Sequence, residues 1–403
     1  MQAGNIRRIF VAASLLSLCL SYVGIWLQLI NDPTERTGAD FIAFYTAGRI
    51  AQSEGAANVY DPVLQQQIQQ QVVGFPLVPG QVLLYNHLPY LIPILKVLMG
   101  ARYVDSFYRW IVIMIAVYFA GILVLSGVLR ERGVDRRSIL LAAAGSLLFL
   151  PVFFSLMNGQ DTAFLFLGAA LWMYGLLSGK EYVAGLGLSL TTIRPHIALF
   201  LAIPMVFHSA RVFLSFLLGS VILAMVSVFI LGLDGTREFI NILLISTGGE
   251  WYGMKENAMF NLIGLLTRAV SQLGSSIIRF IGWIAYIVGM VRVCYLWWKT
   301  GSGKNLPIGV SVVLALFFAP HLHFHDLALL LIPIYELIRM SRENEILKTS
   351  VAIATPIAIS LLLLISNISP YLQYTVPYLV MIVLVIYPYF ARLRTLITTL
   401  HRS

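Results

Sequence analysis

The residue best suited to chemistry is Asp40, in the stretch Thr37–Pro62 (TGADFIAFYTAGRIAQSEGAANVYDP) between two hydrophobic runs. Thr37 stands three residues before Asp40, which is the spacing of a capping box at a helix start, and Phe41 and Tyr45 then recur at helical intervals. This pattern predicts a short amphipathic helix with Asp40 in its first turn, where the helix dipole favours an ionised carboxylate. Such a carboxylate could act as a general base, or it could only cap the helix.

Three further polar groups stand between hydrophobic runs, and together with the Asp40 stretch they supply the candidate binding residues. The candidates are Tyr45, Arg49, Asp61, Asn158, Gln160, Arg194, His196, His323, His325 and Asp326. Ionisable side chains are costly to place at membrane depth, so several on one side of a chain argue for a shared site. Arg194 precedes Pro195 in an apolar region, and its guanidinium needs an anion: Asp326, another carboxylate or a ligand phosphate. A purely structural ion pair is the alternative.

The histidine group His321, His323 and His325 could bind a metal ion. These residues alternate, so in an extended segment they would share a face and, with Asp326, could bind zinc or manganese. No HExxH pattern is present, and imidazoles can equally bind phosphate or hydroxyl groups or have a structural role. We therefore expect no cofactor and do not favour a divalent metal.

The composition is that of an integral membrane protein. Of 403 residues, 59% are hydrophobic and 11% are charged, whereas soluble domains carry about 25% charged residues. The net charge of +9 comes from short basic clusters between apolar runs, as in cytoplasmic loops, so we expect no nucleic-acid partner. The two cysteines, Cys19 and Cys294, both lie within apolar runs, which indicates neither a disulfide framework nor a thiolate metal site.

Hydropathy and the basic clusters predict an all-α polytopic membrane protein with about twelve spans and both termini inside. Residues 1–403 would form a single membrane domain, with outer loops at 31–85 and 234–261 and the second loop able to cover the first. The expected spans are 9–30, 103–129, 138–157, 162–177, 182–193, 195–207, 212–233, 275–298, 306–319, 327–338, 350–365 and 374–390. The first span reads as a retained anchor, because its apolar run is too long for a secretory signal.

Three details within this plan concern local structure. The sequence VLQQQIQQQVV predicts a surface helix whose glutamines favour an interfacial position over burial. Residues 88–99 are short and interrupted by Pro89 and Pro93, which suits a re-entrant or interfacial hairpin. The two short spans that meet at the sequence TIRPH predict a broken helix at Arg194, and broken helices at membrane depth usually line a functional cavity.

Several motifs occur in one order: DFIAFYTAGRI and NVYDP, then NGQDTAFLFLGAAL, then VAGLGLSLTTIRPHIALFLAIP, then HFHDLALLLIP. In this order the chain resembles glycosyltransferase family 87, membrane mannosyltransferases of the GT-C superfamily that use polyprenyl-phosphate-linked sugars. The resemblance runs from Asp40 to about Pro333. It implies a GT-C-like fold, Asp40 as the catalytic base and a phosphate contact for Arg194. The chain departs from the family where a proline-rich, aromatic stretch reads LLYNHLPYLIP, in the region expected to recognise the acceptor.

The resemblance implies a hexosyltransferase that moves a hexose, expected to be mannose, from a polyprenyl-phosphate donor to a glycan or glycolipid acceptor. The partners would then be that donor, that acceptor and membrane lipids, with the site of an inner (plasma) membrane protein facing the periplasm or exterior. A base to deprotonate the acceptor and a cation to stabilise the departing phosphate suit such a reaction. Two alternatives remain: a polytopic transporter or flippase, which would show internal repeats, and a lipid-binding protein without activity.

Overall fold

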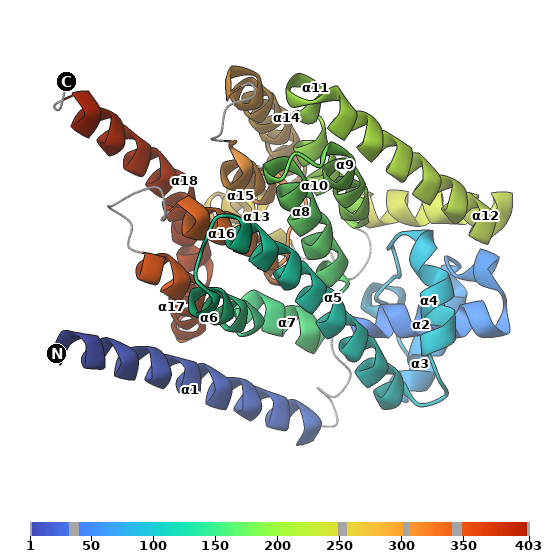
Figure 1. Cartoon of the computed structure of the whole chain (residues 1–403). Coiled ribbons are helices and arrows are strands. Elements are labelled where there is room, and N and C mark those ends of the chain that lie inside the picture. Colours follow the sequence, from blue (N-terminus) through green and yellow to red (C-terminus); the bar gives the residue numbers. More distant parts are fainter. Residues whose placement is uncertain (1, 32–39, 249–255, 301–305, 341–348, 401–403) are drawn as a thin grey trace.

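The computed structural model describes residues 2–31, 40–248, 256–300, 306–340 and 349–400, and within these ranges its regular structure consists of helices alone. Figure 1 shows long helices gathered side by side, with a group of short helices at one end. The predicted all-helical class is therefore confirmed. Short helices are joined by tight connections, and several of these connections carry the polar residues singled out above.

The first part of the chain is a long helix followed by the group of short helices. Its elements are α1 (Gln2–Asn31), α2 (Phe41–Ser53), η1 (Ala56–Asn58), α3 (Pro62–Val73), η2 (Pro79–Gln81), η3 (Pro89–Leu91) and α4 (Ile92–Leu98). The short helices α2, α3 and α4 pack together, away from most of α1 (Figure 1). Helices α2 and α4 approach closely at Gly48, where a Cβ atom would stand 2.7 Å from the Leu95 carbonyl oxygen.

The middle part contains the helices that lead to and from the site. They are α5 (Tyr103–Glu131), α6 (Arg136–Leu147), α7 (Leu150–Asn158), α8 (Thr162–Leu177), α9 (Glu181–Leu190), η4 (Thr191–Ile193), α10 (Pro195–Ala202) and α11 (Met205–His208). Helices α8 and α9 form a tight antiparallel pair, because Gly175 lets the backbone of α8 approach Ala184 directly. The expected break at Arg194 is confirmed: η4 ends at Ile193 and α10 begins at Pro195.

The last part completes the bundle. Its elements are α12 (Ala210–Gly248), η5 (Glu256–Ala258), α13 (Leu262–Ala269), η6 (Ser271–Leu273), α14 (Ser275–Thr300), α15 (Ile308–Phe318), η7 (Phe324–Leu330), α16 (Leu331–Met340), α17 (Thr349–Ser366) and α18 (Pro370–Leu400). Helix α12 is interrupted at Gly232, whose φ of 67° and ψ of −175° are not helical. Beyond this break α12 packs on the short-helix group, where Phe239 meets the Tyr60 ring at 4.9 Å.

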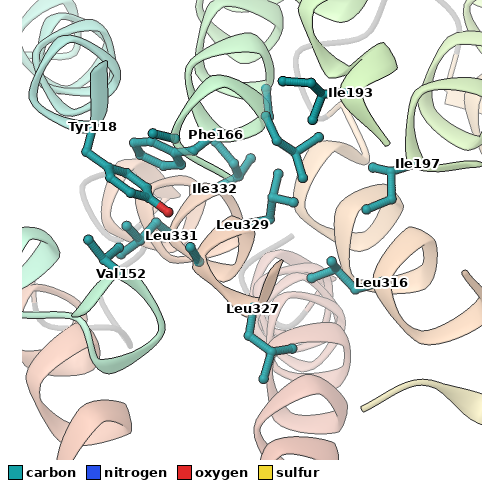
Figure 2. Close-up of a cluster of buried hydrophobic side chains, with 14 of the residues drawn as sticks. Tyr118, Val152, Phe166, Ile193, Ile197, Leu316, Leu327, Leu329, Leu331 and Ile332 are labelled. Atoms are coloured by element: carbon teal, nitrogen blue, oxygen red, sulfur yellow. The ribbon is translucent and has the colours of Figure 1, made fainter. Parts of the chain in front are cut away.

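A buried apolar cluster joins the central helices next to the connections that carry the polar site residues. Figure 2 shows that it draws on α5, α7, α8, η4, α10, α15, η7 and α16 through Tyr118, Val152, Phe166, Ile193, Ile197, Leu316, Leu327, Leu329, Leu331 and Ile332. Several of these are sequence neighbours of candidate site residues: Ile193 precedes Arg194 and Leu327 follows Asp326. Burial of the cluster therefore fixes where the neighbouring polar side chains lie.

Three helices in the described ranges are long and apolar enough to cross a membrane by length and composition. They are Tyr103–Glu131, Ala210–Ile245 and Ser275–Thr300, and the pair Arg136–Leu147 and Leu150–Asn158, bent by 43°, would make a fourth span. Further apolar helices of 10–17 residues occupy most of the other expected spans. The molecule thus has the helices of a polytopic membrane protein, and the number twelve stays a prediction.

Four local predictions differ from the structure. Helix α2 begins at Phe41, so Asp40 precedes the helix instead of lying in its first turn, and its side chain makes no capping hydrogen bond; Thr37 lies outside the described residues. The glutamine prediction for α3 is wrong for Gln65 and Gln69, which are buried, whereas the other four glutamines of the helix are exposed or half-buried. Residues 88–99 form one short helical segment packed on α2 instead of a hairpin. The stretch predicted as a second outer loop continues α12 as far as Gly248.

Candidate functional site

The site is organised around Arg194, which links segments far apart in the chain. The Arg194 Nη2 atom donates to the Gln160 side-chain oxygen at 3.3 Å. Gln160 Nε2 in turn donates to Asp40 Oδ2 at 2.6 Å. Three residues predicted from separate motifs are thus connected by consecutive hydrogen bonds. The bond from Gln160 fixes one oxygen of the Asp40 carboxylate, which is itself half-buried.

Two buried carboxylates hold the Arg194 guanidinium. Its Nη2 lies 3.1 Å from Asp161 Oδ1 and its Nε lies 3.5 Å from Asp326 Oδ1, and both aspartates are fully buried. Burial alone would raise the pKa of Asp161, but the charges of Arg194 and His87 outweigh it and hold that pKa below its usual value. Removing one partner of a buried ion pair typically costs about 3–5 kcal/mol, because the other charge is left uncompensated. Arg194 is therefore firmly fixed.

A second basic side chain, that of His87, contacts the other oxygen of the Asp161 carboxylate. His87 Nδ1 lies 2.8 Å from Asp161 Oδ2, and the His87 side chain is 12% exposed. This residue was missed among the candidates, because its partner is distant in the sequence. The available signal was its place in LLYNHLPYLIP, where the chain departs from the pattern of the family it resembles. Asp161 was expected in the polar turn after α7, without a role of its own.

Asp326 connects the Arg194 group to the histidine segment. Its Oδ2 accepts from the His323 backbone N–H at 3.3 Å and lies 3.7 Å from His325 Nε2, while Thr162 Oγ1 is 3.4 Å from its Oδ1. Burial would raise the pKa of Asp326, but His325 and then Arg194 lower it. Asp326 therefore ties the start of η7 to α8 and α10.

Backbone geometry at Gly159 and Arg194 explains why these side chains converge. Gly159 ends α7 with a left-handed φ of 70°, and a Cβ atom there would stand 2.6 Å from Phe41 Cβ. Its carbonyl accepts from the Trp110 indole at 2.8 Å. The turn therefore brings Gln160 and Asp161 against the start of α2. Arg194 has an extended backbone (φ −122°, ψ 85°), as expected of a residue before proline, and lies between the end of η4 and the start of α10.

The three histidine rings lie close together beside Asp326, with those of His321 and His323 edge to face. The rings of His321 and His323 are 4.6 Å apart and those of His323 and His325 are 5.7 Å apart. Burial lowers the pKa of His323 to about 4, and burial followed by His323 itself lowers that of His321. The His196 carbonyl accepts from the hydroxyl of Tyr286 in α14 at 2.6 Å. Across the described residues, no three His, Cys, Asp or Glu side chains are arranged to hold a metal ion.

Within the part of the chain that the structure describes, the remaining candidates form no hydrogen bond or ion pair with the linked group, by which we mean Asp40, His87, Gln160, Asp161, Arg194 and Asp326. Tyr45 donates to the carbonyls of Gly100 and Ala101 at 3.2 and 3.1 Å. Arg49 donates to Gln52 on its own helix at 2.8 Å. Asp61 caps α3 by accepting from Val63 N–H at 2.7 Å and Leu64 N–H at 3.2 Å. Asn158 is the last residue of α7. The bonds of Tyr45, Arg49 and Asp61 are thus to groups outside the ionic centre, and Asp61 serves as a helix cap.

The fold and the site define a helical membrane protein with a buried ionic centre where several helices end. The chain belongs to glycosyltransferase family 87, whose family model matches residues 89–333. A comparison with curated proteins found no match. The matched region contains Gln160, Arg194 and Asp326 and starts after Asp40. The protein is therefore a membrane glycosyltransferase, and its donor, acceptor and orientation are matters for proposal.

Proposed function

We propose that this protein transfers a hexose, specifically mannose, from a polyprenyl-phosphate donor to a glycan or glycolipid acceptor. The observation that carries the proposal is the linkage of Asp40, through Gln160, to the ion-paired Arg194. A carboxylate whose orientation is fixed by hydrogen bonds is suited to proton abstraction from an acceptor hydroxyl. Membership in a glycosyltransferase family favours this reaction over the alternative of a transporter or flippase.

The chemistry is a single displacement. The acceptor hydroxyl oxygen attacks the anomeric carbon and forms the new glycosidic bond, while the bond from that carbon to the phosphate oxygen breaks with its electron pair. The acceptor proton passes to Asp40, and the polyprenyl phosphate leaves. Inversion at the anomeric carbon follows from one displacement. Asp40 is half-buried, so its carboxylate can reach an acceptor.

Arg194 contributes in two ways under this proposal. Its contacts with Gln160, Asp161 and Asp326 orient the polar groups around Asp40. Its charge also offsets part of the negative charge of these carboxylates, which would otherwise repel a phosphate more strongly. Half-buried His196 and His323 and buried His325 offer imidazole groups for sugar hydroxyls. Tyr45, Arg49 and Asn158 are secondary candidates for substrate contact.

The proposed location is the inner (plasma) membrane, with the site facing the periplasm or exterior. Support comes from the connections that carry the site residues, which sequence analysis places opposite the basic clusters. A lipid-linked donor would enter from the membrane.

Purified protein in lipid, supplied with labelled sugars on defined polyprenyl phosphates, tests this function. We expect label to pass from polyprenyl-phosphate mannose to an acceptor, with the polyprenyl phosphate released in equal amount. Transfer from another polyprenyl-phosphate hexose would correct the sugar. Failure with every donor, together with transport or binding of a lipid-linked sugar, would support one of the alternatives.

We also propose that no metal ion is needed, since Asp40 and the basic groups supply a base and positive charge. The expected result is that treating the active protein with a divalent-metal chelator changes the transfer rate by less than about twofold. Loss of activity on chelation and its return with one added divalent ion would overturn this proposal and assign the histidine segment to metal binding.

A further inference from the structure

The one guanidinium of the site, that of Arg194, is already engaged by carboxylates, so it cannot by itself attract a phosphate. Arg194 is the one guanidinium in the linked group, and it already faces Asp161 and Asp326 and connects through Gln160 to Asp40. Three carboxylates around one guanidinium give a net negative group unless a histidine is protonated. An anionic donor would be repelled by such a group. A further cation should therefore contact the phosphate.

We propose that His87 is a donor-phosphate contact, held by Asp161 so that its Nε2–H points to a phosphate oxygen. This inference rests on the proposed function. The Nδ1 edge of the ring faces Asp161 Oδ2 at 2.8 Å. The opposite edge, Nε2, makes no hydrogen bond to any part of the chain that the structure describes. A carboxylate on Nδ1 fixes the ring, and in the proposed complex the ring bridges two anions, Asp161 and the phosphate, to each of which one ring nitrogen donates.

The backbone around His87 is held from several sides. The Tyr60 hydroxyl donates to the His87 carbonyl at 2.7 Å. Buried Gln65 accepts from the Tyr85 N–H at 2.7 Å, and buried Gln69 bonds the Leu83 backbone through both N–H and C=O. The glutamines of α3 and Tyr60 of the NVYDP motif therefore clamp the extended segment that carries His87. Such a clamp limits the motion of a binding side chain.

The His87 ring also packs on α2, the helix that follows Asp40. Phe44, four residues after Asp40 and one helical turn away, contacts the His87 ring with centroids 4.4 Å apart. Tyr85 flanks it at 5.4 Å. Asp161, which holds His87, is also the partner of Arg194. His87 thus packs on the helix that starts next to the proposed base and shares the Asp161 carboxylate with Arg194.

Binding of a short-chain polyprenyl monophosphate, the lipid product of the proposed reaction, tests this contact. Three substitutions separate a contact to ligand from a role through Asp161. His87→Asn keeps a donor at the Nδ1 position and can still bond Asp161, whereas His87→Gln keeps a donor at the Nε2 position. His87→Ala removes both. Lys96→Gln, an exposed charge change on the neighbouring α4, is the control.

We expect His87→Ala and His87→Asn to weaken binding about 10-fold or more, the effect of one lost charge-assisted hydrogen bond. His87→Gln keeps a donor at the Nε2 position without the charge, so its binding should lie between that of the parent and that of His87→Asn, and Lys96→Gln should match the parent. The uncharged polyprenol should bind all forms equally, and inorganic phosphate should compete with the lipid only in forms that retain the Nε2 donor. All variants should show the parent's elution profile and thermal midpoint within a few degrees.

Full binding by His87→Asn with weak binding by His87→Ala would overturn the proposal, because the residue would then act only through Asp161. Unchanged binding in all three variants, or no binding of the lipid phosphate by the parent, would also overturn it. The outcome is separable from that of the proposed function. His87-dependent binding without sugar transfer would refute the function alone, and transfer with binding indifferent to His87 would refute this contact alone.

Discussion

Asp161 shows how much of the site depends on contacts that no short sequence pattern contains. Its carboxylate is shared by His87, from the segment before η3, and Arg194, from the break before α10. The polar turn NGQD was recognisable in the sequence, because it interrupts two hydrophobic runs. Which of its residues faces which partner depends on the left-handed Gly159 and on the approach of Phe41, and neither follows from composition.

The buried histidines predict how stability depends on pH. The folded-state pKa of His323, about 4, lies below its ordinary value because of burial, and that of His321 is lowered in the same direction. Between about pH 6.5 and 4 the unfolded chain therefore binds more protons, so stability should rise with pH across this window and be lost as the pH falls through it. Thermal unfolding of the purified protein at a series of pH values measures this slope.

The double variant His321→Gln, His323→Gln should reduce that slope, because neither position then titrates. The groups that face these histidines, namely Asp40, Arg194, His196, His325 and Asp326, are left in place. They should retain the rest of the slope and the loss of stability below about pH 4, where carboxylates are protonated. Lys96→Gln should keep the parent's slope throughout. An unchanged slope between pH 6.5 and 4 in the double variant would show that other groups produce it.

At the scale of elements, the two interrupted helices have different origins and were predictable to different degrees. The break at Arg194 was predicted, since proline removes a backbone donor and disfavours the helical region for the residue before it. The break at Gly232 was expected only as the end of a span. The chain instead resumes as a helix, because Gly235 and Phe239 pack on the η1 segment and Tyr60. Such tertiary packing has no local sequence signal.

Gly232→Ala tests the second break. A Cβ atom at Gly232 would meet nothing within 4 Å, so any cost comes from its φ of 67° and ψ of −175°, a region essentially restricted to glycine. We expect a loss of about 1–3 kcal/mol in stability, seen as a lower thermal midpoint. Gly127→Ala is the matched control in α5, with open space and no positive φ. It should be neutral or stabilise by up to about 1 kcal/mol. Equal effects at both positions would contradict the account.

At the scale of the whole molecule, hydropathy predicted the helices well because apolar composition acts over whole segments. The segments predicted at 103–129 and 162–177 correspond closely to α5 and α8. What hydropathy could not supply was the packing of the first polar region, where buried Gln65 and Gln69 bond backbone groups instead of facing the membrane surface. A glutamine reads as polar in the sequence whether its amide is exposed or satisfied internally.

The orientation of the molecule is testable by cysteine labelling in intact cells. Cys19 and Cys294 would first be replaced, and single cysteines placed at Gln67 and Arg136, both exposed. We expect an impermeant reagent added outside to label position 67 and to label position 136 only after the cells are opened, because Arg136 belongs to the densest basic cluster. If the reagent added outside labelled position 136 and not position 67, the molecule would have the opposite orientation to the one predicted.

The proposal that Asp40 is the general base is tested most directly by the transfer rate of purified Asp40→Asn. The amide keeps the size and the hydrogen-bonding oxygen that Gln160 contacts, and Asp40 makes no capping bond, so folding should be little affected. Asp105→Asn, the same change at an exposed helix start, is the control. We predict that Asp40→Asn binds polyprenyl phosphate like the parent and loses about 100-fold or more in transfer, while Asp105→Asn keeps its activity. Near-normal transfer by well-folded Asp40→Asn would contradict the account.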